Sequence, residues 1–258
     1  MADPHYSLLV RLERCMRLRP QLYFALILFA LLGGPAAASD VKAVVELFTS
    51  QGCSSCPRAD KLLGELASDE RLIGLTLAVD YWDYLGWRDT LALHAHTLRQ
   101  KGYANSRGDR QVYTPQAVVN GSVETIGSDR YAIDRIVAKT ASATNLPVPV
   151  VLARNGTSIS VEVGAGAGPA ASIWVLPIIS KSPVTIERGE NRGKTITYHN
   201  VVRGWTRVGD WKGSPVRLSL AVSDLAQSGA DTAAVLVQSG TADAPGPIRG
   251  AALIAFQK

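Results

Sequence analysis

Cysteine is scarce in this chain of 258 residues, which contains only Cys15, Cys53 and Cys56. So few cysteines exclude a small fold that is held together by several disulfides. Cys15 precedes an apolar segment, whereas a lipid-modified cysteine would follow one. A bridge between Cys53 and Cys56 would close a very short loop and would restrict the unfolded chain little. The spacing therefore favours a redox centre over a stabilising bridge.

Charged residues are also few, at 19% of the chain, and the formal net charge is only +5. The first 38 residues account for two of these positive charges, because they contain four arginines and two acidic residues, Asp3 and Glu13. The remaining excess is small and scattered, which argues against a nucleic-acid partner. Apolar residues make up 47% of the chain and are sufficient for an ordinary globular core.

No run is apolar over the length of a membrane span. The apolar core of the N-terminal segment, Leu22–Leu32, has 11 residues, whereas a spanning helix needs about 20. Arginines precede this core and the small residues Ala36–Ser39 follow it, a pattern typical of a signal peptide over residues 1–39. The alternative is an uncleaved N-terminal anchor. Both place residues 40–258 outside the cytoplasm, in the periplasm or secreted.

Apolar periodicity predicts a βαβ unit at the start of the exported part. Asp40–Phe48 and Leu72–Asp80 are short apolar runs typical of buried strands. Between them, Pro57 suits the first turn of a helix, where its missing N–H has no partner to lose. The apolar stripe of this helix consists of Ala59, Leu62, Leu63 and Leu66.

The next segment predicts an aromatic loop at Tyr81–Trp87, followed by a helix at Thr90–Tyr103. Asn120-Gly121 between two apolar runs predicts a β-hairpin, and Ser128 is placed to cap a final helix. The order β-α-β, helix, hairpin, helix is the thioredoxin topology with its central crossover enlarged by a helical insert. We therefore expect an α/β thioredoxin-like domain over residues 40–145.

The segment Leu146–Pro149 resembles a stiff linker, and the chain changes character after it. Clusters of glycine, proline, asparagine and aspartate separate short strand-like runs, a pattern typical of an antiparallel sandwich. We expect an all-β sandwich-like domain over residues 150–258, without a helix. The predicted strands are Val148–Ala153, Ser158–Val163, Ser172–Ile179, Val184–Glu187, Thr195–Val201, Val216–Val222, Ala233–Val237 and Ala251–Phe256.

The segment Cys53-Ser54-Ser55-Cys56 follows the first predicted strand and opens the predicted helix. The thiolate is the reactive form of cysteine, and a helix N-terminus stabilises it. Cys53 would lie at the helix start and Cys56 one turn inward, more deeply buried. We therefore predict a thiol–disulfide oxidoreductase with Cys53 as attacking and Cys56 as resolving thiol. Its partners would be protein or small-molecule thiols and disulfides, and no cofactor or metal is expected.

Thr114-Pro115 precedes the predicted hairpin, where thioredoxin-fold proteins place a cis-proline that faces the redox pair. An X–Pro bond is the only peptide bond for which the cis form costs little. Thr114 could then offer its backbone to an incoming peptide, while Pro115 has no N–H to compete. The alternative is an ordinary trans proline at the start of a strand.

Four strings carry a resemblance to a known family. They are Val44–Pro57, Val79–Trp87, Tyr113–Gln116 and Arg188–Asn191. With these strings the chain resembles an uncharacterised secreted bacterial family, domain of unknown function 1223, within the thioredoxin-fold superfamily. The resemblance runs from about Val41 to the C-terminus and implies the fold, the redox pair and export. The dipeptide Ser54-Ser55 differs from those of the well-known redox enzymes, so the direction of electron flow stays open.

Glu46 lies in the first predicted strand, near where thioredoxins keep a buried carboxylate that assists proton transfer. Its position is one residue further from the cysteines, so it could equally pair with a basic residue. Trp82 and Trp87 could form a peptide-binding lip, although a loop packed over its own domain is the commoner arrangement.

Two other functions compete with the redox hypothesis. A copper or zinc chaperone could bind metal with the cysteines and a histidine, for which His94, His96 and His199 are candidates. Two residues apart on a helix, His94 and His96 would point to opposite sides and could not both reach one ion. Asp80 and Asp83 could add ligands, but turn and capping roles are commoner for them. The third function is a non-enzymatic binding module in which the disulfide only rigidifies a loop.

Overall fold

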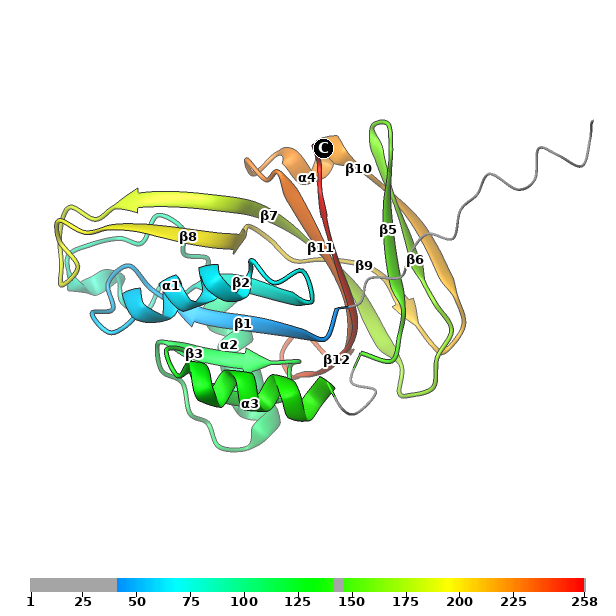
Figure 1. Ribbon diagram of the computed structural model, residues 1–258, viewed down its shortest axis with the longest axis horizontal. Helices are drawn as coiled ribbons and strands as arrows, with labels where there is room; N and C mark the ends of the chain where they lie inside the picture. The colour runs from blue at the N-terminus through cyan, green and yellow to red at the C-terminus, as the bar shows by residue number, and fades with distance from the viewer. Residues whose placement is uncertain (1–40, 142–145, 258) are drawn as a thin grey trace, which may run out of the picture. The chain divides into compact units, whose positions relative to one another are not determined.

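The computed structural model of the chain describes residues 41–141 and 146–257. Within these ranges the chain forms twelve β-strands, four α-helices and one 3-10 turn (Figure 1). The predicted signal peptide, residues 1–39, lies outside the described residues, so its cleavage stays a prediction. No helix in the described ranges is long and apolar enough to cross a membrane.

The predicted βαβ unit consists of β1 (Ala43–Thr49), α1 (Pro57–Leu66) and β2 (Leu72–Ala78). β1 is buried along its whole length and pairs in parallel with β2. The predicted apolar stripe of α1 is buried against β1, because its residues recur at helical spacing on one face. The turn between β1 and α1 contains the cysteine pair.

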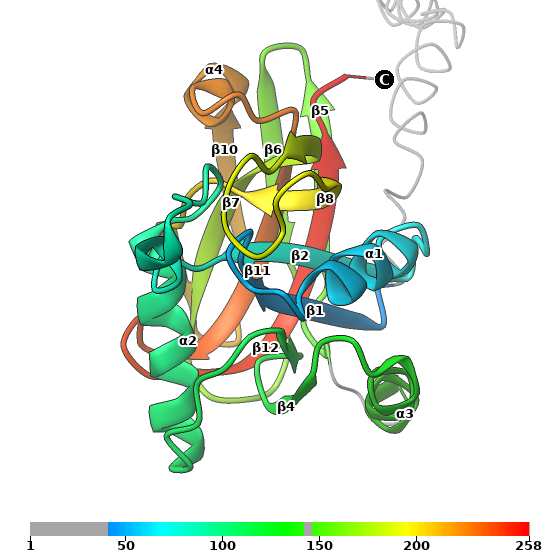
Figure 2. The same cartoon turned by 90° about the vertical axis from the view of Figure 1, so that its left-hand side faces the viewer.

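The first half continues with η1 (Asp83–Leu85), α2 (His94–Arg107), β3 (Gln116–Val119), β4 (Val123–Ile126) and α3 (Arg130–Ala141). β3 pairs antiparallel with β1, and β4 pairs antiparallel with β3. Asn120 and Gly121 connect β3 to β4 with φ angles of 50° and 66°, so the predicted two-residue hairpin is confirmed. Figure 2 shows α1 and α3 on one side of β1, with α2 on the other.

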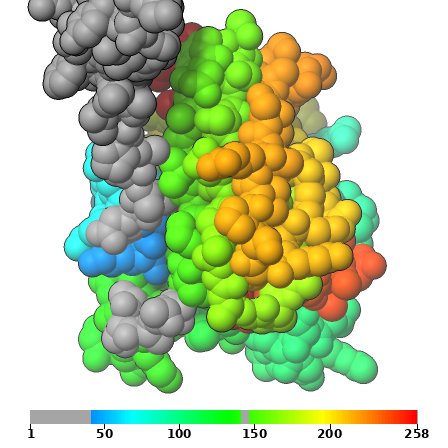
Figure 3. Space-filling model, turned by 90° about the vertical axis from the view of Figure 1, so that its right-hand side faces the viewer, coloured from blue at the N-terminus to red at the C-terminus, as the bar shows by residue number. Residues whose placement is uncertain are grey.

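The second half is mostly β-structure. Its elements are β5 (Val150–Asn155), β6 (Ser158–Val163), β7 (Ala171–Thr185), β8 (Thr195–Val202), β9 (Thr206–Trp211), β10 (Val216–Ala221), α4 (Val222–Ala226), β11 (Thr232–Gly240) and β12 (Pro245–Ala255). The short helix α4 was not expected from the sequence. β5, β6 and β10 form a three-stranded antiparallel sheet, whose strands β6 and β10 lie side by side in Figure 3. This sheet packs on a core that includes Ile173, Val235 and the fully buried Trp211.

All other strands belong to one mixed nine-stranded sheet. Eight of them follow the order β12-β11-β7-β8-β2-β1-β3-β4, and the ninth, β9, pairs with β7. The long strand β7 connects the two halves of the sheet. Its first part pairs with β9 and β11, and its second part pairs with β8. β8 in turn meets β2 in parallel at Thr76 and Val201.

The predicted fold class is therefore wrong. The chain is not a thioredoxin-like fold followed by an all-β sandwich, because strands from both parts of the sequence form one continuous sheet. The enlarged helical insert is also absent from the described residues, where η1 and the single helix α2 join β2 to β3. Strands paired across a long sequence separation leave no local pattern, so β8 beside β2 was not visible in the sequence. Whether residues 40–145 and 150–258 are separate domains stays a prediction.

Candidate functional site around the cysteine pair

Cys53 and Cys56 lie at the turn from β1 into α1 and form a disulfide. Cys56 is the N-cap of α1 and Pro57 its first residue, so the helix begins four residues later than the predicted start at Cys53. Cys53 is 4% exposed and Cys56 is fully buried. The predicted order of exposure is present, but Cys53 is itself nearly covered. Covering residues must therefore move before another thiol can reach the pair.

Thr114 and Pro115 lie against the cysteine pair, and the peptide bond between them is cis as predicted. The carbonyl oxygen of Thr114 is 3.7 Å from Sγ of Cys53. Gly127 donates its N–H to the carbonyl of Pro115 at 2.9 Å. A Cβ atom on Gly127 would lie only 2.4 Å from Cδ1 of Leu47 and 3.2 Å from Cβ of Pro115, so a larger residue here would require Leu47 to move. The predicted site residues Cys53, Thr114 and Pro115 therefore come together in space.

Trp82 spans the space between the two loops of the site. Its indole N–H donates to Oγ1 of Thr114 at 2.8 Å. On the other side, a Cβ atom on Gly52 would lie 3.1 Å from Cβ of Trp82, which leaves little space between them. Tyr84 stacks on Trp82 and is 76% exposed. The aromatic loop therefore packs over the site and presents a tyrosine to solvent at its outer edge.

Asp89 and Asn191 hold the backbone of the loop that leads into the disulfide, and sequence reasoning assigned neither of them to the site. The loop residue Gln51 accepts the indole N–H of Trp87 at 2.7 Å and donates its backbone N–H to Asp89 at 2.7 Å. Asn191, in the loop between β7 and β8, donates to the carbonyls of Gln51 and Cys53 at 2.9 and 2.8 Å. Asn191 is fully buried. The second half of the chain therefore fixes the cysteine loop, residues 50–56, and the string that contains Asn191 was the available signal.

Glu46 lies on the face of β1 that is turned away from α1, because side chains alternate along a strand. Its carboxylate accepts hydrogen bonds from Arg99, whose Nε is 2.7 Å away, and from the hydroxyl of Tyr103. Gln238 donates to the same hydroxyl at 2.8 Å. Burial opposes the charge of Arg99, but Glu46 beside it raises the arginine pKa above its ordinary value. Glu46 therefore pairs with a basic residue, Arg99, as the alternative interpretation of the sequence suggested.

A second group of buried acids lies on the α1 side of β1, and sequence reasoning missed it. Asp60 of α1 is 1% exposed and accepts the hydroxyl of Thr49 at 2.7 Å. Burial raises the pKa of Asp60 to about 8, against the lowering by Thr49, and the charge of Asp89 raises it further. Burial also raises the pKa of Asp89 to about 6. The pKa of Tyr198 is raised by burial and by the charges of both aspartates.

The three histidines take separate positions. His94 is exposed and lies 2.8 Å from the carboxylate of Asp80, whereas His96 is fully buried. The prediction that these two point to opposite sides is confirmed. Burial lowers the pKa of His96 to about 4. His199 packs on α1 at Gly64, and across residues 41–141 and 146–257 no His, Cys, Asp and Glu side chains group in a way that could hold a metal ion.

Asp80 and Asp83 act as hydrogen-bond acceptors in the loop after β2. Asp80 accepts the hydroxyl of Thr97, and Asp83 accepts the backbone N–H of Asp89 at 3.0 Å. These are the turn and capping roles that the sequence favoured over metal binding. The loop thereby holds Asp89 next to the backbone of Gln51.

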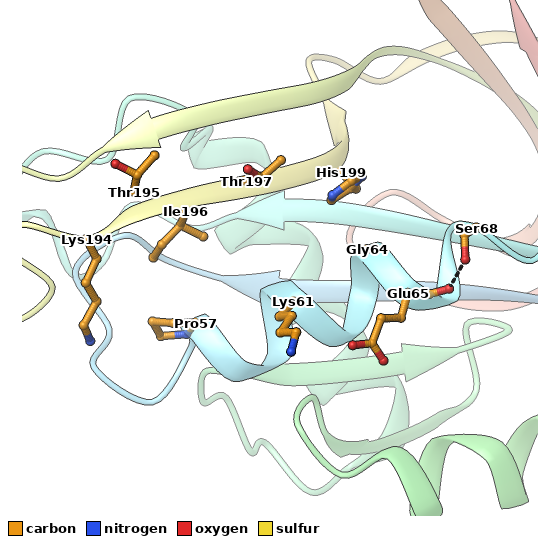
Figure 4. A pocket seen from close by; sticks show the side chains of 10 residues that line it. All are labelled: Pro57, Lys61, Gly64, Glu65, Ser68, Lys194, Thr195, Ile196, Thr197 and His199. Atoms are coloured by element: carbon orange, nitrogen blue, oxygen red, sulfur yellow. Dashed lines mark hydrogen bonds between the residues drawn. The ribbon is translucent and has the colours of Figure 1, made fainter.

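An open groove of about 830 Å³ runs between α1 and β8 (Figure 4). One end of the groove lies at Pro57, directly after the disulfide, and Lys61 and Lys194 line this end. His199 and Gly64 lie toward its other end, where a Cβ atom on Gly64 would be 2.7 Å from the imidazole. Lys194 also donates to Oδ1 of Asn191 at 2.9 Å. The groove therefore carries two lysines and leads along α1 toward the turn that contains the cysteine pair.

The geometry defines a protein with a buried disulfide at a strand-to-helix turn of a large mixed sheet. Residues 44–238 match the family described as protein of unknown function, DUF1223, and the chain belongs to this family. The crystal structure of a protein from Agrobacterium tumefaciens is similar to this chain, with 38% sequence identity and a TM-score of 0.76. The match covers 86% of this chain and 97% of that protein. None of the curated proteins matches the chain.

Proposed function

We propose that this chain exchanges thiols and disulfides outside the cytoplasm, with Cys53 as the attacking thiol and Cys56 as the resolving thiol. In this proposal Cys53 forms a mixed disulfide with a thiol or disulfide partner. Cys56 then attacks Sγ of Cys53, the intramolecular disulfide forms, and the partner leaves as a thiolate. The chemistry requires the local geometry of the pair and no particular fold class.

The observation that carries the proposal is the position of Thr114 at the cysteine pair. Its carbonyl oxygen lies 3.7 Å from Sγ of Cys53, and Pro115 beside it has no N–H. An incoming extended peptide could donate a backbone N–H to such a carbonyl while its own sulfur approaches Cys53. The N-terminus of α1 supports the same role, because its free N–H groups favour a nearby thiolate.

The burial of Cys53 favours a second candidate function. A structural bridge would be covered, and Cys53 is only 4% exposed. In that case the disulfide would fix the loop that Asn191 and Asp89 also hold, and the protein would be a binding module. A copper or zinc chaperone remains a third alternative. Export to the periplasm or medium is part of the proposal and rests on the N-terminal signal pattern.

The decisive experiment compares Cys56→Ser with Cys53→Ser after incubation of each reduced variant with glutathione disulfide. Cys56→Ser should accumulate a glutathione adduct on Cys53, because the resolving step is missing. Cys53→Ser should accumulate much less, because Cys56 is fully buried. Mass spectrometry of the intact variants measures both adducts.

Two results would contradict the proposal. Equal and low adduct formation in both variants, together with a wild-type disulfide that survives excess dithiothreitol in the folded protein, would identify a structural bridge. Stoichiometric binding of Cu(I) or Zn²⁺ by the reduced wild type, lost in both variants, would favour the chaperone.

A further inference from the structure

Cys56 and Asp60 share one face of α1. Cys56 has helical dihedral angles, with φ −72° and ψ −34°, and its carbonyl accepts the backbone N–H of Asp60 at 3.0 Å. Residues four apart on a helix lie one above the other, with Cβ atoms about 5–6 Å apart. The helix therefore places the carboxyl group of Asp60 one turn below the sulfur of Cys56.

The carboxyl group of Asp60 is buried and incompletely paired. Its Oδ1 accepts the hydroxyl of Thr49, whereas its Oδ2 has no hydrogen-bond partner among the described residues. Native structures rarely leave a buried polar atom unpaired, because this costs free energy that a nonpolar side chain would not. The unpaired oxygen of Asp60 therefore calls for a role that uses its carboxyl group.

The surroundings of Asp60 are acidic. Asp89, from the loop before α2, and Tyr198, from β8, are the titratable groups that interact with it electrostatically. The hydroxyl of Tyr198 is also unpaired within the described part of the chain. Lys61 and Lys194 line the open groove together with the imidazole of His199.

We propose that Asp60 exchanges a proton with Cys56 whenever the disulfide opens or closes. This inference rests on the proposed function and assigns the proton path at the same site. When a partner thiolate attacks Sγ of Cys53, the bond between Cys53 and Cys56 breaks and its electron pair goes to Cys56. Asp60 gives its proton to that thiolate and becomes a carboxylate. In the reverse step the Asp60 carboxylate takes the proton from Cys56, whose thiolate attacks Sγ of Cys53.

Asp60 is suited to this role because its affinity for a proton is close to that of a thiol. Its pKa of about 8 approaches the ordinary thiol pKa of about 8.5, so transfer in either direction costs little. At neutral pH Asp60 holds a proton while the disulfide is intact. The departing Cys56 thiolate is thus met by a proton donor inside a site that excludes water.

The other buried groups fit the role less well. Both carboxylate oxygens of Asp89 are engaged by backbone N–H groups, of Gln51 and Leu91, at 2.7 and 2.8 Å. Glu46 lies on the opposite face of β1 and is paired with Arg99. Asp60 alone among these three acids lies one helical turn from a cysteine.

The test measures the rate of disulfide reduction by dithiothreitol from pH 6 to pH 9 in wild type and Asp60→Asn, followed by intact mass after acid quench. The ratio of the two rates cancels the titration of dithiothreitol itself. We expect the wild type to be several-fold faster at neutral pH and its advantage to disappear as pH rises through about 8. Glu65→Gln, an exposed substitution on the same helix, should leave the profile unchanged.

A second variant keeps the test independent of how well Asp60→Asn folds. Asp89→Asn should move the midpoint of the wild-type profile to lower pH, because the charge of Asp89 raises the pKa of Asp60. A rate ratio that does not depend on pH, or a midpoint that Asp89→Asn leaves in place, would overturn the assignment of Asp60. Failure of glutathione trapping in Cys56→Ser would instead overturn the proposed function, since reduction by dithiothreitol needs no natural partner.

Discussion

The two faces of β1 bury acidic side chains in opposite ways. On one face, Glu46 is surrounded by donors, with Arg99 as a cation and Tyr103 as a hydroxyl partner. On the other face, Asp60 has a single hydroxyl donor, Thr49, and the acidic Asp89 as a neighbour. A buried charge is stable only when it is paired, and an unpaired carboxyl keeps its proton instead. One strand thus separates a structural ion pair from a group that is ready to exchange a proton.

This contrast also places Glu46, which the sequence suggested for proton transfer, on the face of β1 that is turned away from the cysteine helix. Glu46 belongs to the even-numbered residues of β1, which face α2, whereas the cysteine helix covers the odd-numbered residues. A shift of one residue along a strand moves a side chain to the opposite face. A carboxyl group that serves Cys56 must therefore come from α1 or from residues facing it.

The largest expected effect is a change in the pH dependence of stability in Asp60→Asn. Asp60 has a pKa of about 8 in the folded protein and an ordinary value of 3.8 when unfolded. Between these values the folded state retains a proton that the unfolded state has lost, so stability falls as pH rises. The contribution of Asp60 to the free energy of unfolding should fall by about 1.4 kcal/mol per pH unit, up to about 6 kcal/mol in total. Asparagine should abolish this slope, as measured by urea denaturation at several pH values.

Asp69→Asn is the matched control for this slope. Asp69 is partly exposed, and its hydrogen bonds to Arg71 lower its pKa to about 2, so it stays ionised between pH 5 and pH 8 in both states. This variant should keep the wild-type slope across that window. An unchanged slope in Asp60→Asn would show that Asp60 is ionised in the folded protein and would remove the contrast between the two faces.

The next effect concerns the opposite face. Arg99→Met leaves Glu46 buried without its cation and should lower the free energy of unfolding by about 3–5 kcal/mol. Arg130→Met, which removes only exposed ion pairs with Glu65 and Asp134, should cost about 0–1 kcal/mol. Addition of Glu46→Gln to Arg99→Met should recover part of the loss. If Arg99→Met lowered the free energy of unfolding no more than Arg130→Met, the buried pair of Glu46 and Arg99 would not stabilise the fold, and the contrast between the two faces of β1 would be wrong.

The local part of the site could be predicted from the sequence. Cysteine spacing after an apolar run, Pro57 at the first helical position and Asn120-Gly121 are short-range signals, and the structure contains the turn, helix and hairpin that they indicate. Thr114 could be placed because it lies next to one of these elements. Each of these features depends on residues within a few positions of one another.

The remaining part could not be predicted because it depends on contacts between distant segments. Asn191 reaches the carbonyls of Gln51 and Cys53 only because β8 extends the sheet beside β2. Asp60 looked like an ordinary acidic residue in a first helical turn, where a helix dipole favours it. Its burial arises because β8 and the loop that carries Asp89 pack against α1. Both contacts join segments that are far apart in the sequence, so local patterns could not predict them.

Asn191→Ala tests whether the second half of the chain holds the cysteine loop, residues 50–56, in place. The substitution removes the donor for two buried carbonyl groups and should cost about 1–3 kcal/mol in the free energy of unfolding. Hydrogen exchange should also become faster at the backbone N–H groups of residues 51–56. Asn155→Ala, at the exposed end of β5, is the control and should change neither quantity. Unchanged exchange in Asn191→Ala would mean that Asp89 and Trp87 suffice to hold the loop.

The smallest effect on stability, but a direct one on access, is expected for Trp82→Ala. Trp82 is only partly buried, so its removal should cost less than that of a core side chain, yet it lies between Gly52 and Thr114 over the disulfide. The variant should be reduced several-fold faster by dithiothreitol at pH 7, because Cys53 becomes accessible. Tyr131→Ala removes an aromatic side chain that is 76% exposed on α3 and should leave the rate unchanged. An unaltered rate in Trp82→Ala, with global unfolding as slow as in wild type, would mean that other residues limit access to Cys53. If Trp82→Ala is reduced faster but keeps the wild-type pH profile, Trp82 limits access to Cys53 without affecting proton transfer. Access and proton transfer would then depend on different residues, Trp82 and Asp60.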